Sequence, residues 1–413
     1  MEKRIIAALE IADREVRLLV GQFYNGRINI LKVEHVDHDG YIDGRLVRGH
    51  RIVEAIEKAV QNASANLNAH ISKVIVSVYG LDNEITSKRI SLPVVGRISE
   101  YDLKRALKEV YTYPAPENMV CVNALFTRFY VNGVPTRKIP VNERNENVQV
   151  DYQAYYCNQD ALFEIIRCVE NAGLEVIDVV LSDIGFASEA LLFEASVDHP
   201  VVGVTFEMMS TQLSLYYQGQ LASTMHLNYG FEIFLKKLME TYKLSRDVVE
   251  RLLFYDVDVS DVSPNDDPIF IWSTKSNSHH LSAKDLLNCI GNDIIKMLDD
   301  IHDTCEPIYQ LGNVEYVFTG VASRVDGLVE TMHAISDADA RVYRSSTFGV
   351  KDPRYTSLIG SFYYYKDTEF YRGSSQSSID EEIFVKDVIG TDKHHSHENE
   401  NTVTKRLRTL FMD

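Results

Sequence analysis

Cysteine is scarce in this sequence, and long apolar runs are missing from it. Five cysteines are spread over 413 residues, and none of them stands in a C-x-x-C arrangement. This number and spacing predict neither a disulfide framework nor a zinc site, so we expect reduced thiols. No apolar stretch approaches the ~18–20 residues that span a bilayer. The apolar run at residues 5–9 soon meets Glu10 and Asp13, which indicates a first strand rather than a signal peptide.

Positive charge is also in short supply. The chain has 42 Lys and Arg against 60 Asp and Glu, a net charge of −18 at pH 7. Such a chain repels nucleic acid as a whole, so only a local basic patch could bind an anionic surface. Motifs of nucleophilic, zinc-protease and P-loop chemistry are absent as well. We therefore expect no nucleic-acid partner, no metal ligands and no catalytic residues.

The sequence does contain enough apolar residues for several cores. It is 45% hydrophobic and 25% charged, and its length allows two to four domains at about 100–200 residues each. The first eighty residues predict three strands, a helix and a fourth strand. These lie at residues 3–11, 15–23, 27–36, 52–67 and 73–79.

The same order returns two hundred residues later. Strands are expected at 200–206, 212–217 and 221–227, a helix around 231–238, a long helix at about 282–308, a strand at 314–318 and a helix around 325–333. A hairpin-rich β-β-β-α-β-α unit that occurs twice indicates an internal duplication. We also expect an insertion in each copy. The first, at 82–156, has a helix at 100–110 and strands at 120–130 and 148–156; the second has an acidic loop at 256–267, and His279 and His280 are expected in a loop.

Four stretches resemble one known family in their order along the chain. They are Ala8-Leu9-Glu10-Ile11 with the strand that follows, residues 160–184, Tyr316-Val317-Phe318-Thr319-Gly320, and residues 352–360. The chain is similar to the FtsA family of bacterial cell-division proteins over nearly its whole length. The resemblance implies an α/β, actin-like fold, built from duplicated subdomains of the ribonuclease-H type.

The same resemblance divides the chain into six parts. Subdomain 1A would take residues 1–81 and 157–197, and the inserted subdomain 1C residues 82–156. Subdomain 2A would take residues 198–227 and 301–371, and subdomain 2B residues 228–300. A polar linker would follow at 372–402, and a membrane-targeting amphipathic helix at 403–413.

The positions that would meet a nucleotide depart from the family pattern. Glycine-rich turns let backbone N–H groups reach phosphates, but the first turn here is Ala12-Asp13-Arg14 and the second is formed by Thr205, Glu207, Met208, Met209 and Ser210. The Glu–Lys pair of the 2B helix becomes Glu250 and Leu253, and the adenosine turn keeps only Thr319 and Gly320. Either this is an unusual site for ATP and Mg²⁺, or it is a pseudo-ATPase whose cleft is filled by side chains, with the two methionines in the phosphate space. The loss of both turns favours the second interpretation, with no cofactor and no enzymatic activity.

The last residues form a basic amphipathic pattern. Val403, Leu407, Leu410 and Phe411 recur at helical spacing, and Lys405, Arg406 and Arg408 surround them. This pattern is typical of a helix that lies on an anionic membrane. The alternative is a helix docked on the body of the protein or on a partner. A segment this short needs some surface on which to fold, and the polar linker before it favours a distant one.

The resemblance implies a non-catalytic adaptor that tethers FtsZ filaments to the cytoplasmic face of the membrane at the division site. It also implies self-association into filaments. The acidic tail of FtsZ would dock on the 2B block, where the available bases are Lys236, Lys237, Arg246 and Arg251. The alternatives are a kinase-like enzyme of the same fold, an ATP-binding actin-like filament protein, and a pilus-type actin-like scaffold. A kinase needs a phosphate cradle that these turns do not supply, and the basic terminal segment favours the adaptor.

Overall fold

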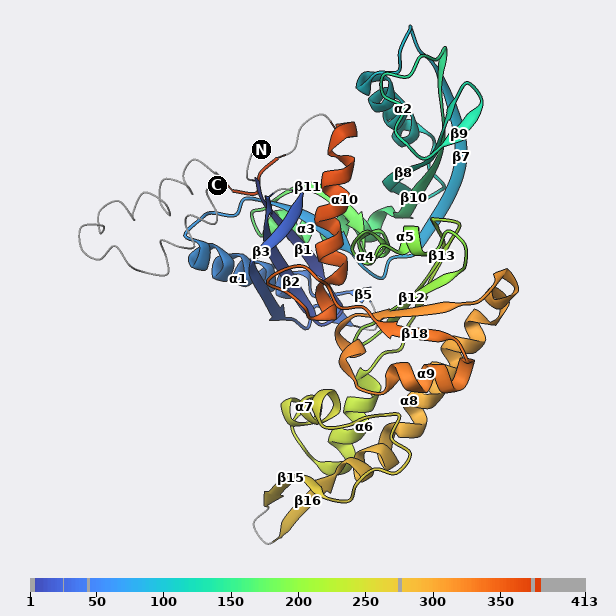
Figure 1. The fold of residues 1–413 in the computed structure, drawn as a ribbon. Helices are drawn as coiled ribbons and strands as arrows, with labels where there is room; N and C mark the ends of the chain where they lie inside the picture. The colour runs from blue at the N-terminus through green and yellow to red at the C-terminus, as the bar shows by residue number, and fades with distance from the viewer. Residues whose placement is uncertain (1–3, 25, 43–44, 274–276, 373–375, 380–413) are drawn as a thin grey trace, which may run out of the picture.

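The computed structural model describes residues 4–24, 26–42, 45–273, 277–372 and 376–379. Its centre is a pair of five-stranded sheets (Figure 1). The first sheet has the order β11-β6-β1-β2-β3. Its strands are β1 (Arg4–Ile11), β2 (Glu15–Tyr24), β3 (Arg27–Asp37), β6 (Lys73–Val78) and β11 (Glu175–Leu181). β1, β2 and β3 are antiparallel, whereas β6 runs parallel to both β1 and β11.

Helices cover both faces of this first sheet. Helix α1 (Gly49–Leu67) packs against β2, β3 and α3 (Gln159–Asn171), while α10 (Thr356–Arg372) packs against β1, β6 and β11. β1 is buried without interruption from Ile5 to Ile11. A strand covered on both sides has a continuous apolar run rather than an alternating one, which is why the sequence predicts this strand well. We call this sheet and its helices the first domain.

The second sheet repeats the topology of the first. Read from its other edge, its order is β18-β17-β12-β13-β14, with β12 to β14 antiparallel and β17 and β18 parallel to β12. Its strands are β12 (Val201–Phe206), β13 (Thr211–Tyr217), β14 (Gln220–Leu227), β17 (Glu315–Thr319) and β18 (Asp339–Val342). α9 (Leu328–Ser336) packs against β18 and against the long helix α8 (Ala283–Cys305). The predicted duplication is therefore confirmed at the level of strand order, and we call this half the second domain.

The first insertion forms a sheet of its own, in the order β7-β10-β8-β9. It consists of β7 (Asn83–Pro93), α2 (Glu100–Thr112), β8 (Met119–Val131), β9 (Val134–Thr136) and β10 (Asn147–Asn158), and it projects from the first domain (Figure 1). The expected helix and two strands are present, and α2 begins with a capping box between Ser99 and Asp102. The sequence did not predict β7, because this strand is largely polar and only partly buried.

The second insertion is mostly helical. It contains α6 (Glu232–Tyr242), α7 (Arg246–Tyr255) and the hairpin of β15 (Pro268–Ser273) and β16 (Ser278–Ser282), which lead into α8. The loop expected around His279 and His280 is wrong, because both residues lie in β16. His279 stacks on Trp272 of the facing strand, with ring centroids 5.2 Å apart. This cross-strand contact stabilises the hairpin, in which Trp272 pairs directly with His279.

The two domains are joined where two helices cross. α4 (Ser182–Ala190) packs against α10 at Gly185 and Gly360. A Cβ atom on Gly360 would lie 1.7 Å from the carbonyl oxygen of Gly185, and one on Gly185 would lie 2.3 Å from the carbonyl oxygen of Ser357. Only glycine permits this backbone approach. Short elements complete the chain: β4 (Tyr41–Ile42), β5 (Arg45–Leu46), α5 (Leu192–Ala195), and the 3₁₀ helices η1 (Glu306–Leu311), η2 (Val321–Arg324) and η3 (Pro353–Tyr355).

The polar linker expected at 372–402 is corrected at its beginning. Ser378 is fully buried, and its backbone N–H donates to Ile5 while its carbonyl accepts from Ser72, at 2.9 and 3.0 Å. Its hydroxyl accepts from the backbone N–H of Ala7 at 2.8 Å. The chain therefore joins the first domain again at 376–379. The rest of the predicted linker and the predicted amphipathic helix at 403–413 lie outside the described residues.

Candidate functional site

The two turns predicted to meet a nucleotide lie against each other. The β1–β2 turn carries Asp13, and the β12–β13 turn carries Glu207, Met208, Met209 and Ser210. Oδ2 of Asp13 accepts from the backbone N–H of Met209 at 2.8 Å and from the hydroxyl of Ser210 at 3.1 Å. Tyr79, which follows β6, bonds to the same hydroxyl at 3.0 Å. The structure therefore brings the two predicted turns together, and protein groups make the contact between them.

Arg17 is the centre of this contact. Its side chain is 2% exposed, and its guanidinium donates to both carboxylate oxygens of Glu207, at 2.9 and 2.6 Å. It also donates to Glu15 at 2.6 Å and to Glu10 at 3.0 Å. Arg17 belongs to the first domain and Glu207 to the second. A buried, bidentate ion pair therefore joins the domains where the phosphate turns of the family would face a nucleotide.

A second arginine extends the cluster. Arg354, in η3, donates to Glu15 at 2.9 Å and to Asp352 at 3.1 Å, and its carbonyl accepts from Arg17 at 3.0 Å. Burial raises the pKa of Glu10 to about 7, although Arg17 acts in the opposite direction. Burial, and then the charge of Glu207, raise the pKa of Asp13 to about 7. Both carboxylates lie near the negative charge of Glu207, and this charge would also repel a further anion placed beside them.

The space left beside the Arg17–Glu207 pair, on the side of Glu10, is very small. A cavity of about 10 Å³ lies there, enough for about one water molecule. The residues that line it are Glu10, Arg17, Tyr79, Thr205, Glu207, Thr319, Gly320, Pro353, Arg354 and Ser357. Thr319 is satisfied by protein groups, since its hydroxyl bonds to the carbonyl of Pro353 and to Thr356. Gly320 has φ +89°, and a Cβ atom there would lie 2.3 Å from the carbonyl oxygen of Phe206.

The expectation that two methionines fill the phosphate space stays a prediction, but a charged pair lies in the contact between the two turns. The Arg17–Glu207 pair occupies that region, Met208 packs into the core of the second domain, and Met209 lines a different cavity beside Asp13. Leu253 is fully buried in the same core rather than in the cleft. The sequence analysis missed Arg17. The available signal was a set of charges at positions 10, 15 and 17 inside strands that are otherwise apolar and buried.

A larger cavity of about 280 Å³ opens next to the ion cluster. Arg14, Met208 and Glu250 line it, together with three further arginines from the second domain and from η3. Those three are already paired: Arg246 with Glu232 and Glu250, Arg324 with Asp352, and Arg354 with Glu15 and Asp352. Among the described residues, only Arg14 of this group lacks an ion pair. The cavity therefore offers little uncommitted positive charge to a triphosphate.

The four bases expected to receive the tail of FtsZ do not form one patch. Lys237 pairs with Asp293 at 2.6 Å, and Arg246 faces the cleft in its pairs with Glu232 and Glu250. Lys236 is exposed, and Arg251 is exposed with its guanidinium 5.6 Å from the ring centroid of Phe270. Arg246 is therefore removed from the prediction, which now depends on Lys236 and Arg251.

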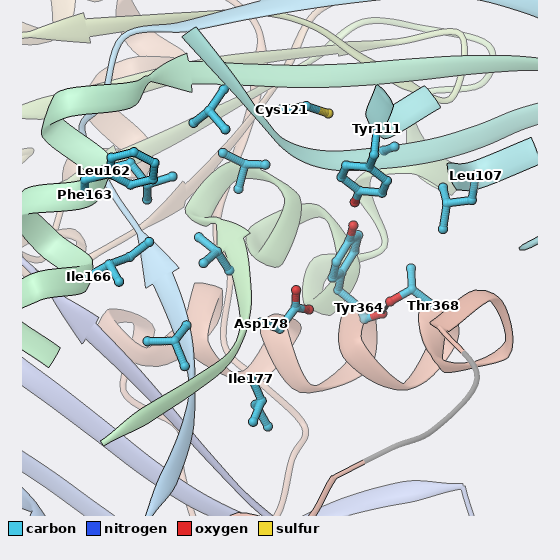
Figure 2. A pocket seen from close by; sticks show the side chains of 15 residues that line it. Leu107, Tyr111, Cys121, Leu162, Phe163, Ile166, Ile177, Asp178, Tyr364 and Thr368 are labelled. Atoms are coloured by element: carbon cyan, nitrogen blue, oxygen red, sulfur yellow. Dashed lines mark hydrogen bonds between the residues drawn. The ribbon is translucent and has the colours of Figure 1, made fainter. Parts of the chain in front are cut away.

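Another large cavity lies elsewhere. It measures about 470 Å³ and is formed by the first insertion, α3, β11 and α10. Figure 2 shows Leu162 and Ile166 on one side of it, and the hydroxyl groups of Tyr111 and Tyr364 directed toward each other. The sequence analysis did not anticipate it, because four separate segments create it. Within the described part of the chain no group of His, Cys, Asp and Glu is placed to hold a metal ion, and no helix is long and apolar enough to cross a membrane.

Comparison with known proteins agrees with this architecture. No family model matches the chain. Cell division protein FtsA of Bacillus subtilis strain 168 is 22% identical over 376 residues, which cover 86% of this chain and 82% of that protein. The chain resembles the FtsA proteins over most of its length. FtsA of Staphylococcus epidermidis strain RP62A is 21% identical over 415 residues, which cover 95% of this chain and 86% of that protein.

Solved structures show that the fold is actin-like. A chain of the PilM–PilN type IV pilus biogenesis complex superposes with a TM-score of 0.57 at 13% identity, over 86% of this chain and 97% of that one. MreB5 of Spiroplasma citri bound to ADP superposes with a TM-score of 0.53 at 10% identity, over 90% of this chain and 99% of that one. The predicted fold class is therefore confirmed, while the subdomain boundaries stay a prediction.

Proposed function

We propose that this protein is a non-catalytic adaptor that holds FtsZ filaments at the cytoplasmic face of the cell membrane during division. The similarity to FtsA proteins over about 85% of the chain supports a role in division. The basic amphipathic pattern at 403–413 supports a membrane contact. The filament partner is FtsZ, and self-association along that filament brings many weak membrane contacts together.

The Arg17–Glu207 ion pair is the observation that carries the non-catalytic part of the proposal. Phosphoryl transfer needs a cradle of backbone donors and a metal held by carboxylates. Here the carboxylates nearest to the turns are bound to a guanidinium of the protein itself. Arg17 joins the two domains through protein groups alone, which supports an adaptor that uses no cofactor, neither ATP nor Mg²⁺.

The FtsZ contact is assigned to the helices of the second insertion. Lys236 on α6 and Arg251 on α7 are exposed, and neither takes part in the ion pairs that Lys237 and Arg246 form. An acidic peptide could therefore pair with them without displacing an existing carboxylate. Surface pairs of this kind contribute modest affinity each, and mainly set specificity and association rate.

Co-sedimentation with liposomes tests the proposal. The full chain, purified FtsZ with GTP and vesicles that contain phosphatidylglycerol are mixed without ATP. We expect the chain to pellet with vesicles and to bring FtsZ with it. Deletion of 403–413, or replacement of Leu407 and Phe411 by Glu, is expected to release both proteins from the vesicles. The FtsZ contact itself is then measured by affinity for the FtsZ tail peptide.

Charge reversal separates the two contacts. Lys236→Glu with Arg251→Glu is expected to leave vesicle binding unchanged and to lower the affinity for the tail peptide. Lys296→Glu on α8 is the matched control, because this lysine is exposed in the same half of the molecule. Unchanged peptide affinity in the double variant would remove these two bases from the contact. A deletion variant that still pellets with vesicles in the absence of FtsZ would show that the terminal segment is not the anchor.

A further inference from the structure

A second interdomain cavity shares Asp13 with the cleft described above. It measures about 270 Å³. Ile11, Asp13 and Leu81 of the first domain line it, and so do Ser210 and His226 of the second. The proposed tether of FtsZ to the membrane makes no use of this cavity. The ligand of this cavity is therefore a separate question from the FtsZ and membrane contacts.

Asp13 brings an unsatisfied acceptor to this cavity. The residue is 8% exposed, and its Oδ2 is used by Met209 and Ser210. Its Oδ1 is buried and has no hydrogen-bond partner among the described residues. A buried carboxylate oxygen without a donor is costly. Arg17 does not supply the missing donor, because its guanidinium is shared among Glu10, Glu15 and Glu207.

His226 brings a second acceptor, and its tautomer follows from the hydrogen bonds around it. The side-chain N–H₂ of Gln212 donates to the carboxylate of Asp183, at 3.1 and 3.3 Å. The amide oxygen of Gln212 is therefore the atom that lies 3.2 Å from Nδ1 of His226, so Nδ1 must donate. Burial lowers the pKa of His226, which keeps the ring neutral. Its Nε2 is then an acceptor.

Three carboxylates lie near this cavity, those of Asp13, Asp183 and Glu207, and Arg17 is a nearby cation. Tyr79, which also lines the cavity, has its pKa raised by burial and by the charges of Glu207, Asp13 and Asp183. The cavity thus combines acceptors, negative charge, and the apolar side chains of Ile11 and Leu81. An ammonium group on a short alkyl stem matches all three features, since it has three donors, a positive charge and an apolar chain.

We propose that this cavity binds a small primary alkylamine in its ammonium form, with Asp13 as its counter-ion and His226 as a further acceptor. The stem lies against Ile11 and Leu81. Asp13 comes from the first domain and His226 from the second, so the ligand ties the domains together. A cation would then act at the interdomain cleft of this actin-like protein, in contrast to a nucleotide polyanion. The proposal is independent of the membrane and FtsZ contacts.

Calorimetric titration of the full chain with n-butylammonium chloride tests the proposal. We expect saturable binding at one site per chain and a rise of the unfolding temperature with ligand concentration. Tetramethylammonium chloride at the same concentration is the control for charge alone, because it has no N–H donor. Equal effects of the two salts would overturn the proposal, and so would the absence of saturable binding.

Variants then locate the site. Asp13→Asn keeps the shape and the acceptor for Met209, and we expect it to weaken binding at least about tenfold. Asp37→Asn is the matched control, because Asp37 is an exposed carboxylate that lines the neighbouring cavity but not this one. Leu81→Trp fills the cavity without changing a charge and is expected to abolish binding even if Asp13→Asn fails to fold. Binding that survives both variants would place the amine elsewhere and overturn the assignment.

Discussion

At the scale of single residues, Arg17 is the group that connects the two sides of the interdomain cleft. Its guanidinium is buried and compensated by three carboxylates from two domains. Such an arrangement is weak evidence for net stability, because desolvation offsets much of the attraction. It is nevertheless sensitive to the loss of one partner, because the remaining charge stays buried. The cluster therefore holds the two domains together through a buried ion pair.

We expect Glu207→Gln to destabilise the protein by about 3–5 kcal/mol, the usual effect of breaking a buried ion pair. Urea denaturation measures it. Asp293→Asn is the control, since it breaks the half-exposed pair with Lys237 at 2.6 Å, where the loss should stay below about 1 kcal/mol. An equal loss of unfolding free energy in the two variants would contradict a buried ion pair between Arg17 and Glu207.

At the scale of elements, the segment at 376–379 is the clearest departure from the sequence analysis. Its composition is polar and predicts a linker, yet Ser378 and Ile379 are buried against the first domain. Backbone groups of Ile5, Ala7 and Ser72 bind Ser378. Composition could not reveal this, because the contact depends on backbone groups more than three hundred residues away along the chain. The predicted linker is accordingly shorter than its composition indicates.

Truncation tests this element. A chain that ends after Ile379 should unfold at the same urea concentration as the full chain. A chain that ends after Arg372 should lose a few kcal/mol, because the three hydrogen bonds of Ser378 contribute about 0.5–1.5 kcal/mol each and a buried Ile about 1.5–3 kcal/mol. Identical unfolding midpoints for the two truncated chains would mean that the segment adds no stability.

At the scale of the whole molecule, the interdomain cleft is closed by protein groups of opposite charge. The two domains also meet through Asp13 with Met209 and through Asp183 with Gln212. These contacts use Oδ2 of Asp13, while its Oδ1 has no hydrogen-bond partner among the described residues. A triphosphate that approached both turns would lie beside the carboxylate of the Arg17–Glu207 pair, and this repulsion is the physical basis of the next prediction.

We expect no measurable heat when ATP and Mg²⁺ are titrated into the full chain, and no release of phosphate. MreB5 of Spiroplasma citri, solved with bound ADP, serves as the positive control for the same instrument and buffer. A stoichiometric, micromolar ATP site in this chain would refute the pseudo-ATPase interpretation. If adenosine bound and ATP bound with no higher affinity, only the turn at Thr319 and Gly320 would retain nucleotide contacts.

The order β1-β2-β3-α1-β6, and its return in β12-β13-β14-α6-α8-β17, was readable from the sequence alone. Runs such as β1 and β12 are continuous and apolar because helices cover both faces of each sheet, and this burial leaves a local signal that repeats after two hundred residues. The absence of glycine from the turn at Asp13 is equally local. By itself it indicates an altered phosphate site, because a side chain in that turn hinders the approach of backbone N–H groups to a phosphate.

Tertiary structure alone decided which groups fill that site. Arg17 and Glu207 are 190 positions apart in the sequence, and the residues next to each of them do not predict that the two side chains pair. The orphaned oxygen of Asp13, the tautomer of His226 and the burial of Ser378 likewise depend on residues brought together from distant segments. Local patterns determine elements because they act through neighbouring backbone and side chains. Charge pairing and cavities depend on how the domains close on each other, which periodicity does not encode.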